Sequence, residues 1–344
     1  MIERPDLSQV DPAIRAYIQT LEAELDYYKG KEKPLSEIEP EAPQEAEEPP
    51  TTINLVVMTA QGLIKRTPRH HYQHQRRGGM GIFDLDAPKE DAPHILALAD
   101  EKQTLLVFTN LARVFRLPIS QISESPIRAR GQSLATRLGL QPDEHLVAAL
   151  PDLARGAVTL ASERGMVRTL RHHVFGEYMR PGTALFNPNQ LGQLVTACLT
   201  PGDGDLLIAT RRGKAIRFSE KLVPPQGGPG IRLEEGDDVV AIAAVYDDSL
   251  VFVVDDQGKG TIRQMASFNP NKSSGGGGKI IMNSDSLTAA LTVQPDADLF
   301  MISQLSKLIR FKMNEVPVKD SNVQGVICMN LRADLVTAVT VTQP

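Results

Sequence analysis

A sixfold internal repeat is the sequence feature that most constrains how this chain folds. From residue 51 onward, each repeat of about 49 residues opens with an apolar β-type run such as NLVVMT, passes a turn, and closes with a second β-rich run such as HILALA. Such a unit accommodates four short strands, the size of one propeller blade, and a single blade cannot bury both of its faces alone. The repeats divide the chain near residues 51–99, 100–150, 151–200, 201–245, 246–293 and 294–344.

Two single-residue markers accompany these runs. A basic residue ends the second strand of each repeat: Arg66, Arg116, Arg168, Arg217, Arg263 and Arg310. A glycine follows thirteen to fifteen residues later: Gly81, Gly131, Gly182, Gly230, Gly278 and Gly325. The glycines predict positions that need φ > 0 or close backbone approach. For the arginines, a salt bridge between blades is at least as well supported as a phosphate contact, so we leave them out of the predicted site.

The markers together predict an all-β, six-bladed propeller over residues 51–344. A β-sandwich would have to produce three markers in phase across six repeats by coincidence.

The N-terminal residues differ from the repeats. Residues 1–30 carry an apolar stripe at helical spacing (Ile14, Ile18, Leu21, Leu25, Tyr28), which predicts one amphipathic helix. Residues 31–50 are rich in Pro and Glu and predict a disordered acidic linker. The stripe can pack on the main domain, dimerise as a short coiled coil, or dock onto another protein, and the linker favours docking away from its own domain.

The charge of the chain is uneven. The formal net charge is -5, but residues 51–200 carry seventeen Lys and Arg against twelve Asp and Glu, whereas residues 201–344 carry fifteen against seventeen. An anionic partner would favour the first half. Because ordinary surfaces often carry such an excess, only the clustering of the charges can indicate whether the chain binds nucleic acid.

Cysteine usage and hydropathy indicate the compartment. Cys198 and Cys328 lie in apolar runs without the spacing of a metal site or a disulfide framework. The charged N-terminus has no apolar signal region, and no run of eighteen apolar residues occurs. The sequence predicts a cytoplasmic protein without membrane contact.

The sharpest local motif is Gln75-Arg76-Arg77-Gly78-Gly79-Met80-Gly81. Three glycines in four residues let a backbone approach a partner and turn its N–H groups outward, and adjacent arginines can fork onto phosphate oxygens. In isolation, an exposed glycine turn that happens to carry two arginines explains the string better.

The position of the motif in the first of six repeats changes that judgement. The string resembles the box of the DNA gyrase A C-terminal domain, Gln-Arg-Arg-Gly-Gly-Lys-Gly, and matches it at six of seven places. The resemblance extends from residue 51 to about residue 342. It implies a β-pinwheel that bends DNA around a basic rim, with Gln75 to Gly81 as the wrapping loop.

Two departures from that family narrow the expectation. Met80 stands where the family has lysine, which removes one phosphate contact and leaves chiral wrapping open. The family's breakage-reunion domain would need several hundred residues before the propeller, where only the helix and linker stand. We therefore expect no catalysis by this chain alone, neither cleavage nor ATP hydrolysis.

Other basic residues near the marker glycines extend the predicted DNA track. They are Arg128, Arg130, Arg180, Lys272, Lys279 and Lys319. The fourth repeat offers only glycine and proline there, so the track is expected to be uneven. Histidines near the loops (His70, His71, His74, His172, His173) lack an ordered ligand set, so neither a metal nor any other cofactor is predicted.

These observations predict a module that binds, bends and wraps duplex DNA without base specificity, as a nucleoid-associated accessory to DNA topology control. Two partners are open for the N-terminal helix: a second copy of this chain or a topoisomerase subunit. The alternative is a propeller that holds a protein partner without wrapping DNA. A propeller enzyme would need convergent carboxylates in a central pocket, and the sequence shows no such set.

Overall fold

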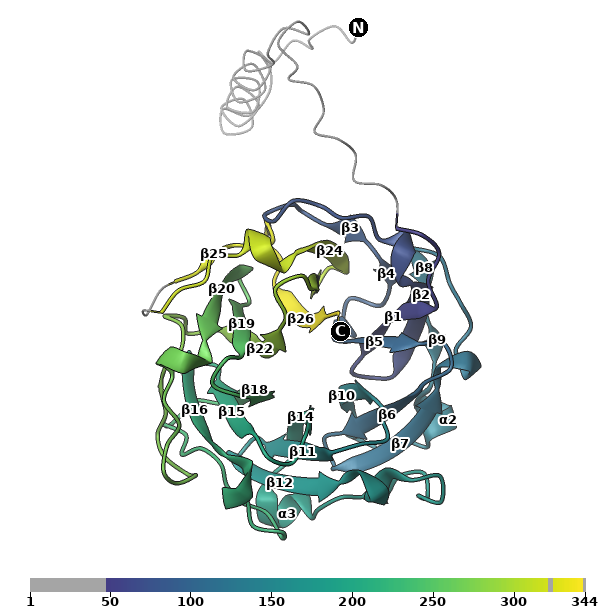
Figure 1. Cartoon of the computed structure of the whole chain (residues 1–344). Coiled ribbons are helices and arrows are strands. Elements are labelled where there is room, and N and C mark those ends of the chain that lie inside the picture. The colour runs from purple at the N-terminus through teal and green to yellow at the C-terminus, as the bar shows by residue number, and fades with distance from the viewer. Residues whose placement is uncertain (1–47, 321–323, 343–344) are drawn as a thin grey trace, which may run out of the picture. The chain divides into compact units, whose positions relative to one another are not determined.

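Six four-stranded sheets surround a central axis in the computed structural model, which describes residues 48–320 and 324–342 (Figure 1). This arrangement confirms the predicted all-β, six-bladed propeller. The expected helix in residues 1–30 and the linker up to residue 47 lie outside the described residues.

Each blade takes three strands from its own repeat. The innermost strands come from the closing runs: β5 (Pro93–Asp100), β10 (Leu146–Pro151), β14 (Leu194–Thr200), β18 (Val239–Val245), β22 (Leu287–Val293) and β26 (Val336–Val341). The opening runs form the next strands: β1 (Ile53–Thr59), β6 (Thr104–Thr109), β11 (Ala157–Ser162), β15 (Asp205–Thr210), β19 (Leu250–Asp255) and β23 (Asp298–Ser303). The third strands are β2 (Leu63–Pro68), β7 (Arg113–Pro118), β12 (Met166–Arg171), β16 (Lys214–Ser219), β20 (Lys259–Gln264) and β24 (Lys307–Lys312).

The outermost strand of each blade comes from the following repeat. These short strands are β9 (Gln132–Ser133), β13 (Thr183–Ala184), β17 (Gly228–Pro229), β21 (Lys279–Ile280), β25 (Val326–Ile327) and β3 (Ile82–Phe83). The first repeat closes the ring, because β3 pairs with β24 of the sixth blade, with Ile82 opposite Leu308. Each blade therefore combines residues of two adjacent repeats.

The remaining elements are short. A 3-10 helix follows each third strand: η2 (Arg69–His71), η3 (Ile119–Gln121), η4 (His172–Phe175), η5 (Glu220–Leu222), η6 (Met265–Ser267) and η7 (Met313–Glu315). Two single-turn helices, α2 (Ala135–Leu138) and α3 (Pro188–Leu191), and the parallel strand pair β4 (Leu85–Asp86) and β8 (Ala129–Arg130) complete the fold. Within the described ranges, no helix has the length and apolar character needed to cross a membrane.

Alternating side chains on each strand explain where the core lies. Leu55 and Val57 pack against the sixth blade, whereas Val56 and Met58 pack against the second. Successive side chains of a strand point to opposite faces of a sheet, so every blade buries both faces against its neighbours. The hydrophobic core is accordingly divided into six clusters, one between each pair of adjacent blades.

The marker glycines lie directly before the outer strands, with one exception. Gly81, Gly182, Gly278 and Gly325 have φ between 73° and 76°. A Cβ on Gly131 would lie 2.8 Å from the carbonyl oxygen of Ile64, so close approach explains that position. In the fourth repeat the register identifies Gly227 (φ 94°), rather than the predicted Gly230, as the equivalent residue.

The marker arginines share one register in four repeats only. Arg66, Arg116, Arg217 and Arg310 lie four residues after the positive-φ turn residue of their hairpins. Arg168 lies one residue earlier and Arg263 one residue later in their own hairpins. Because a shift of one residue turns a side chain to the other face of the sheet, the predicted sixfold equivalence of these arginines is wrong for those two.

Candidate nucleic-acid interface

The chain crosses the perimeter of the ring six times on its way from a 3-10 helix to an outer strand. We call these crossings the perimeter segments: residues 72–81, 122–131, 176–182, 223–227, 268–278 and 316–325, the last described without 321–323. All the sequence-predicted DNA contacts belong to these segments or to the outer strands that follow them. The segments distribute the contacts around the circumference and do not gather them into one pocket.

The loop from Gln75 to Gly81 is held firmly against blades five and six. The N–H of Gln75 donates to the carbonyl oxygen of Arg310 at 2.8 Å, and the N–H of Gly78 donates to that of Cys328 at 2.8 Å. The N–H of Gly79 donates within the loop to the carbonyl oxygen of Arg76 at 3.1 Å. These amides are already used inside the protein, so the prediction that the loop backbone turns its N–H groups toward a ligand is wrong for them.

The two arginines of the loop have different environments. Arg76 is exposed, and no hydrogen bond or ion pair joins its side chain to the described residues. Arg77 is half-buried: its guanidinium donates to the carbonyl oxygen of Ile327 at 2.6 Å, and its N–H donates to Oε2 of Glu315 at 2.8 Å. Arg76 is therefore available for a phosphate, whereas Arg77 anchors the loop to the outer strand of blade five.

Glycine is required at two positions of the loop. Gly78 and Gly81 have φ of 82° and 73°, and a Cβ on Gly81 would lie 2.8 Å from the carbonyl oxygen of Leu308. Met80, between Gly79 and Gly81, is 52% exposed. The loop thus presents one free arginine and one apolar side chain at the perimeter.

The other predicted basic residues are all exposed. They are Arg128, Arg130, Arg180, Lys272, Lys279 and Lys319. Arg128 has φ of 64°, a conformation that is costly for any residue other than glycine. Such strained residues are more frequent at functional sites. Nζ of Lys279 lies 5.9 Å from the ring centroid of Phe268, an arrangement that leaves the ammonium in solvent.

Sequence reasoning missed two exposed side chains on the perimeter. Arg232 follows β17, and its guanidinium would lie 3.7 Å from a Cβ on Gly277, so it adds a cation beside the fifth perimeter segment. Tyr178, in the third segment, is fully exposed. The pattern of basic residues before the marker glycines indicates neither, because Arg232 follows the predicted marker Gly230 and Tyr178 is not basic.

The in-register arginines connect neighbouring blades. Arg217 donates to the carbonyl oxygens of Met265 at 2.8 Å and Phe268 at 3.3 Å, and Arg310 donates to that of Tyr72 at 2.9 Å. Both guanidinium side chains are nearly inaccessible to solvent. The sequence left open whether the marker arginines make structural contacts between blades or bind phosphate. Arg217 and Arg310 make structural contacts.

Two loop histidines pair with carboxylates. Nε2 of His74 lies 2.8 Å from Oδ1 of Asp298, and Nε2 of His172 lies 2.5 Å from Oδ1 of Asp152. Burial alone would raise the pKa of Asp298, but hydrogen bonds from His74, Lys312 and Arg310 hold it well below its ordinary value. No group of three side chains suited to a metal ion occurs in residues 48–320 and 324–342.

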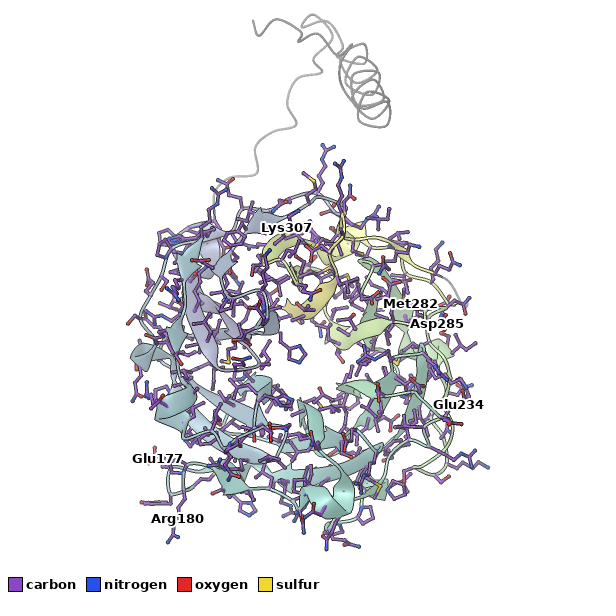
Figure 2. All side chains as sticks on the ribbon, turned by 180° about the vertical axis from the view of Figure 1, so that it is seen from behind. Glu177, Arg180, Glu234, Met282, Asp285 and Lys307 are labelled. Carbon is purple, nitrogen blue, oxygen red and sulfur yellow. The ribbon has the colours of Figure 1, made fainter. Side chains whose placement is uncertain are left out.

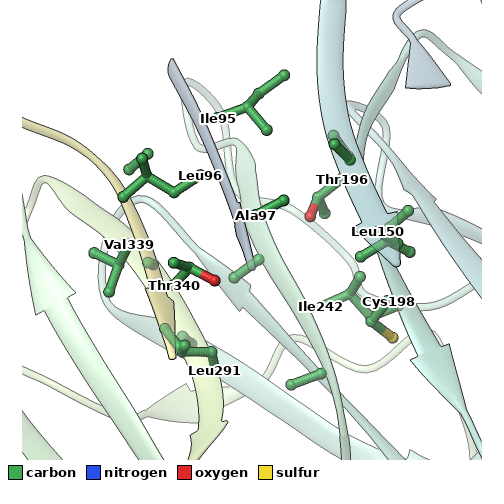
Figure 3. Close-up of a pocket in the computed structure, with 18 of the residues that line it drawn as sticks. Ile95, Leu96, Ala97, Leu150, Thr196, Cys198, Ile242, Leu291, Val339 and Thr340 are labelled. Carbon is green, nitrogen blue, oxygen red and sulfur yellow. The ribbon is translucent and has the colours of Figure 1, made fainter. Parts of the chain in front are cut away.

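A central pocket lies where the innermost strands meet (Figure 3). Aliphatic side chains and threonines form most of its lining, with Leu96, Leu150 and Leu291 among them; His94 and Cys198 also line it, and no Asp or Glu does. Burial raises the pKa of the Cys198 thiol there, so the reactive thiolate is disfavoured. The pocket does not supply the convergent carboxylates that a propeller enzyme would need.

Comparison with known proteins agrees with this architecture. The family model described as "DNA gyrase C-terminal domain, beta-propeller" matches residues 54–92, 103–151, 204–245 and 297–343. DNA gyrase A of Escherichia coli (strain K12) is 28% identical over 292 residues, which are 81% of this chain and 33% of that protein. That of Mycobacterium leprae is 28% identical over 80% of this chain and 23% of its own length. The chain thus spans a third or less of these two relatives.

Two solved structures have the same fold. The DNA gyrase A C-terminal domain superposes with a TM-score of 0.74 at 19% identity, over 83% of this chain and 98% of that one. The C-terminal domain of DNA topoisomerase IV gives a TM-score of 0.61 at 20% identity, over 85% and 93% of the two chains.

Proposed function

The chain belongs to the DNA gyrase C-terminal domain family, and from that premise we propose that its perimeter binds and bends duplex DNA without reading the base sequence. The observation that carries this proposal is the distribution of exposed cations over successive perimeter segments. Arg76, Arg128, Arg180 and Lys272 belong to four different crossings of the circumference.

Electrostatics supplies the driving force in this proposal. Each lysine or arginine that neutralises a phosphate releases condensed counterions, a contribution that does not depend on sequence. Smooth bending costs on the order of 1 to 6 kcal/mol per 20 to 30 base pairs, so several segments have to act together for the duplex to follow the ring. Arg232 and Lys279 would extend the path past the fourth blade.

The salt dependence of binding tests the proposal. The logarithm of the binding constant should fall with the logarithm of salt concentration at a slope of about -0.9 per phosphate contact. Arg76→Ala should make that slope shallower by about 0.9. Arg155→Ala is the matched control, because Arg155 is exposed in the turn between β10 and β11, outside the perimeter segments. A slope near zero in the unaltered protein would refute DNA binding.

A second candidate, a scaffold for a protein partner, is favoured by the apolar side chains exposed on blades five and six. Met80, Phe83 and Ile327 are 52%, 42% and 53% exposed. Titration with duplexes of increasing length separates the two functions. Bending around the ring predicts affinity that grows with duplex length, whereas a scaffold predicts weak binding that does not depend on length.

The biological role we propose is that of an accessory to DNA topology control, acting on DNA in the nucleoid of the cytoplasm. DNA bending needs no catalytic group, so the proposed role assigns no reaction to this chain. A topoisomerase subunit or a second copy of the chain would bind through residues 1–30. Crosslinking followed by mass spectrometry of the full chain, with and without residues 1–30, tests that assignment.

A further inference from the structure

Tyr178 is the most exposed large apolar or aromatic side chain in the described part of the chain. It is 100% exposed, and the next in rank, Ile327, is 53% exposed. Tyr178 lies in the third perimeter segment, four residues before Gly182, as Arg77 lies four residues before Gly81. Counted from the marker glycine, Tyr178 therefore lies in the third repeat where the predicted DNA loop lies in the first repeat.

The backbone that carries Tyr178 is fixed on both sides. Phe175 is completely buried, and Met179 packs against the same cluster between blades two and three. The N–H of Met179 donates to the carbonyl oxygen of Gly176 at 3.0 Å, which makes Tyr178 the third residue of a tight turn. The backbone that carries the ring is thus rigid, so a ligand that binds Tyr178 has only its two side-chain torsions to order.

The charges around Tyr178 favour an anionic partner. Arg171 and Arg180 are exposed cations on the same stretch of chain, against a single exposed acid, Glu177. Figure 2 labels Glu177 and Arg180 where this loop projects from the perimeter. The hydroxyl of Thr183 donates to the carbonyl oxygen of Arg180 at 2.7 Å and fixes the backbone from which that guanidinium extends.

A protein partner fits this site less well than DNA does. Contacts that dominate protein interfaces cluster with other apolar anchors. Exposed apolar side chains of the perimeter lie on blades four to six (Met80, Phe83, Ile280, Val318 and Ile327). Beside Tyr178, in contrast, Glu177 and Arg180 are exposed and Met179 packs inward.

We propose that Tyr178 and Arg180 form a nucleobase-stacking contact, in which Arg180 binds a phosphate and the ring of Tyr178 stacks on a base face. This contact rests on the DNA-binding function proposed above. A regular duplex hides its base faces, but a kinked step or an unpaired base exposes one, and side chains inserted at such steps stabilise bent DNA. The ligand is therefore duplex DNA with a locally unstacked base.

Binding to two duplexes of equal length tests the contact, one fully matched and one with a central unpaired base. Stacking on one base is worth about 5- to 150-fold in Kd, so the unaltered protein should prefer the second duplex by a factor in that range. Tyr178→Ala should lose the preference while retaining its affinity for the matched duplex and its salt slope. Because the chain has no tryptophan, Tyr178→Trp provides a single indole whose emission the second duplex should quench.

Tyr246 is the matched control. It is 47% exposed, but its hydroxyl donates to Oδ1 of Asp203 at 2.8 Å, and Asp247 and Asp248 follow it. Phosphates would be repelled there, so Tyr246→Ala should keep the preference and Tyr246→Trp should show no quenching.

Three results would overturn the stacking contact but not the proposed DNA-binding function. The first is equal affinity of the unaltered protein for the two duplexes, and the second is an intact preference in Tyr178→Ala. The third is an indole at position 178 that responds only to an added topoisomerase subunit. The last result would identify a protein interface. Absence of any salt-dependent binding to either duplex would instead overturn the proposed DNA-binding function, and the stacking contact with it.

Discussion

A buried ion pair marks the seam where the ring closes. Nζ of Lys65 lies 2.6 Å from Oδ1 of Asp84, and neither side chain is exposed. The hydroxyl of Tyr72 donates to the same oxygen at 2.8 Å. Burial lowers the pKa of Lys65, although Asp84 opposes that shift, and burial raises the pKa of Tyr72 well above its ordinary value. Asp84 directly follows β3, the strand that the first repeat donates to the sixth blade.

The other repeats show that the fold does not require these charges. At the place of Asp84 they have Leu134, Leu185, Gly230, Ile281 and Cys328. At the place of Tyr72 they have Ile122, Phe175, Val223, Phe268 and Val316. An apolar side chain therefore packs well at four of the five places equivalent to Asp84 and at all those equivalent to Tyr72.

Removing one charge should cost far more than removing both. Lys65→Met leaves a buried carboxylate and Asp84→Leu leaves a buried ammonium, and each should lower the free energy of unfolding by about 3 to 5 kcal/mol. The double variant Lys65→Met/Asp84→Leu removes both charges, but it takes one hydrogen-bond partner from the Tyr72 hydroxyl and one from the backbone carbonyl oxygen of residue 84, at a cost of about 1 to 3 kcal/mol for each. Adding Tyr72→Phe should recover the part of that loss that comes from the hydroxyl.

Denaturant unfolding followed by circular dichroism measures these differences, and a double-mutant cycle isolates the coupling between the two charges. We expect a coupling of about 4 kcal/mol. If the double variant were destabilised by the sum of the two single losses, the charges would not be coupled across the seam and the reasoning would be refuted.

Three further predictions follow from individual sites. Burial, together with nearby carboxylates, raises the pKa of Glu220, so the ionised form of this side chain opposes folding. The cost appears as pH rises through the folded-state pKa. Glu220→Gln should therefore raise the thermal midpoint at pH 7 to 8, and the gain should shrink toward pH 4. Met80→Lys should steepen the salt slope of DNA binding by about 0.9 and increase affinity, and an unchanged slope would show that position 80 does not reach a phosphate. Gly139 has φ of 59° and open space around it, so Gly139→Ala should lower the free energy of unfolding by about 1 to 2 kcal/mol through backbone strain alone. Gly81→Ala should lower it more, because the new Cβ would also meet Leu308. Equal losses in the two variants would contradict that close contact.

The fold could be predicted from sequence because its signals are local and repeated. Side chains of strands such as β1 (Ile53–Thr59) alternate between two buried faces, and six copies of one pattern reinforce one interpretation. Exchange of outer strands between repeats carries no local signal, since a two-residue strand such as Ile82–Phe83 is too short to show periodicity.

The site was harder to predict, because residue type does not reveal which partner a side chain takes. Arg76 and Arg77 are adjacent and chemically identical, yet only the fold brings the carbonyl oxygen of Ile327 within 2.6 Å of Arg77. Arg168 and Arg263 appeared equivalent to Arg217, and only the strand register separated them. Tyr178 carries no charge and belongs to none of the repeated markers, so no pattern in the sequence indicated its exposure.

Ring closure and the proposed DNA loop depend on the same stretch of chain. Between Tyr72 and Asp84, the backbone passes from the buried polar cluster at the seam, through the loop that exposes Arg76, to strand β3 on the sixth blade. A ligand that binds only the closed arrangement stabilises it in proportion to the logarithm of ligand concentration over Kd. If DNA binds this loop, a saturating duplex should therefore restore part of the stability lost in Lys65→Met, and less of it in Lys65→Met/Arg76→Ala. Equal recovery in the two variants would mean that DNA stabilises the ring through other segments and that Arg76 does not link binding to closure.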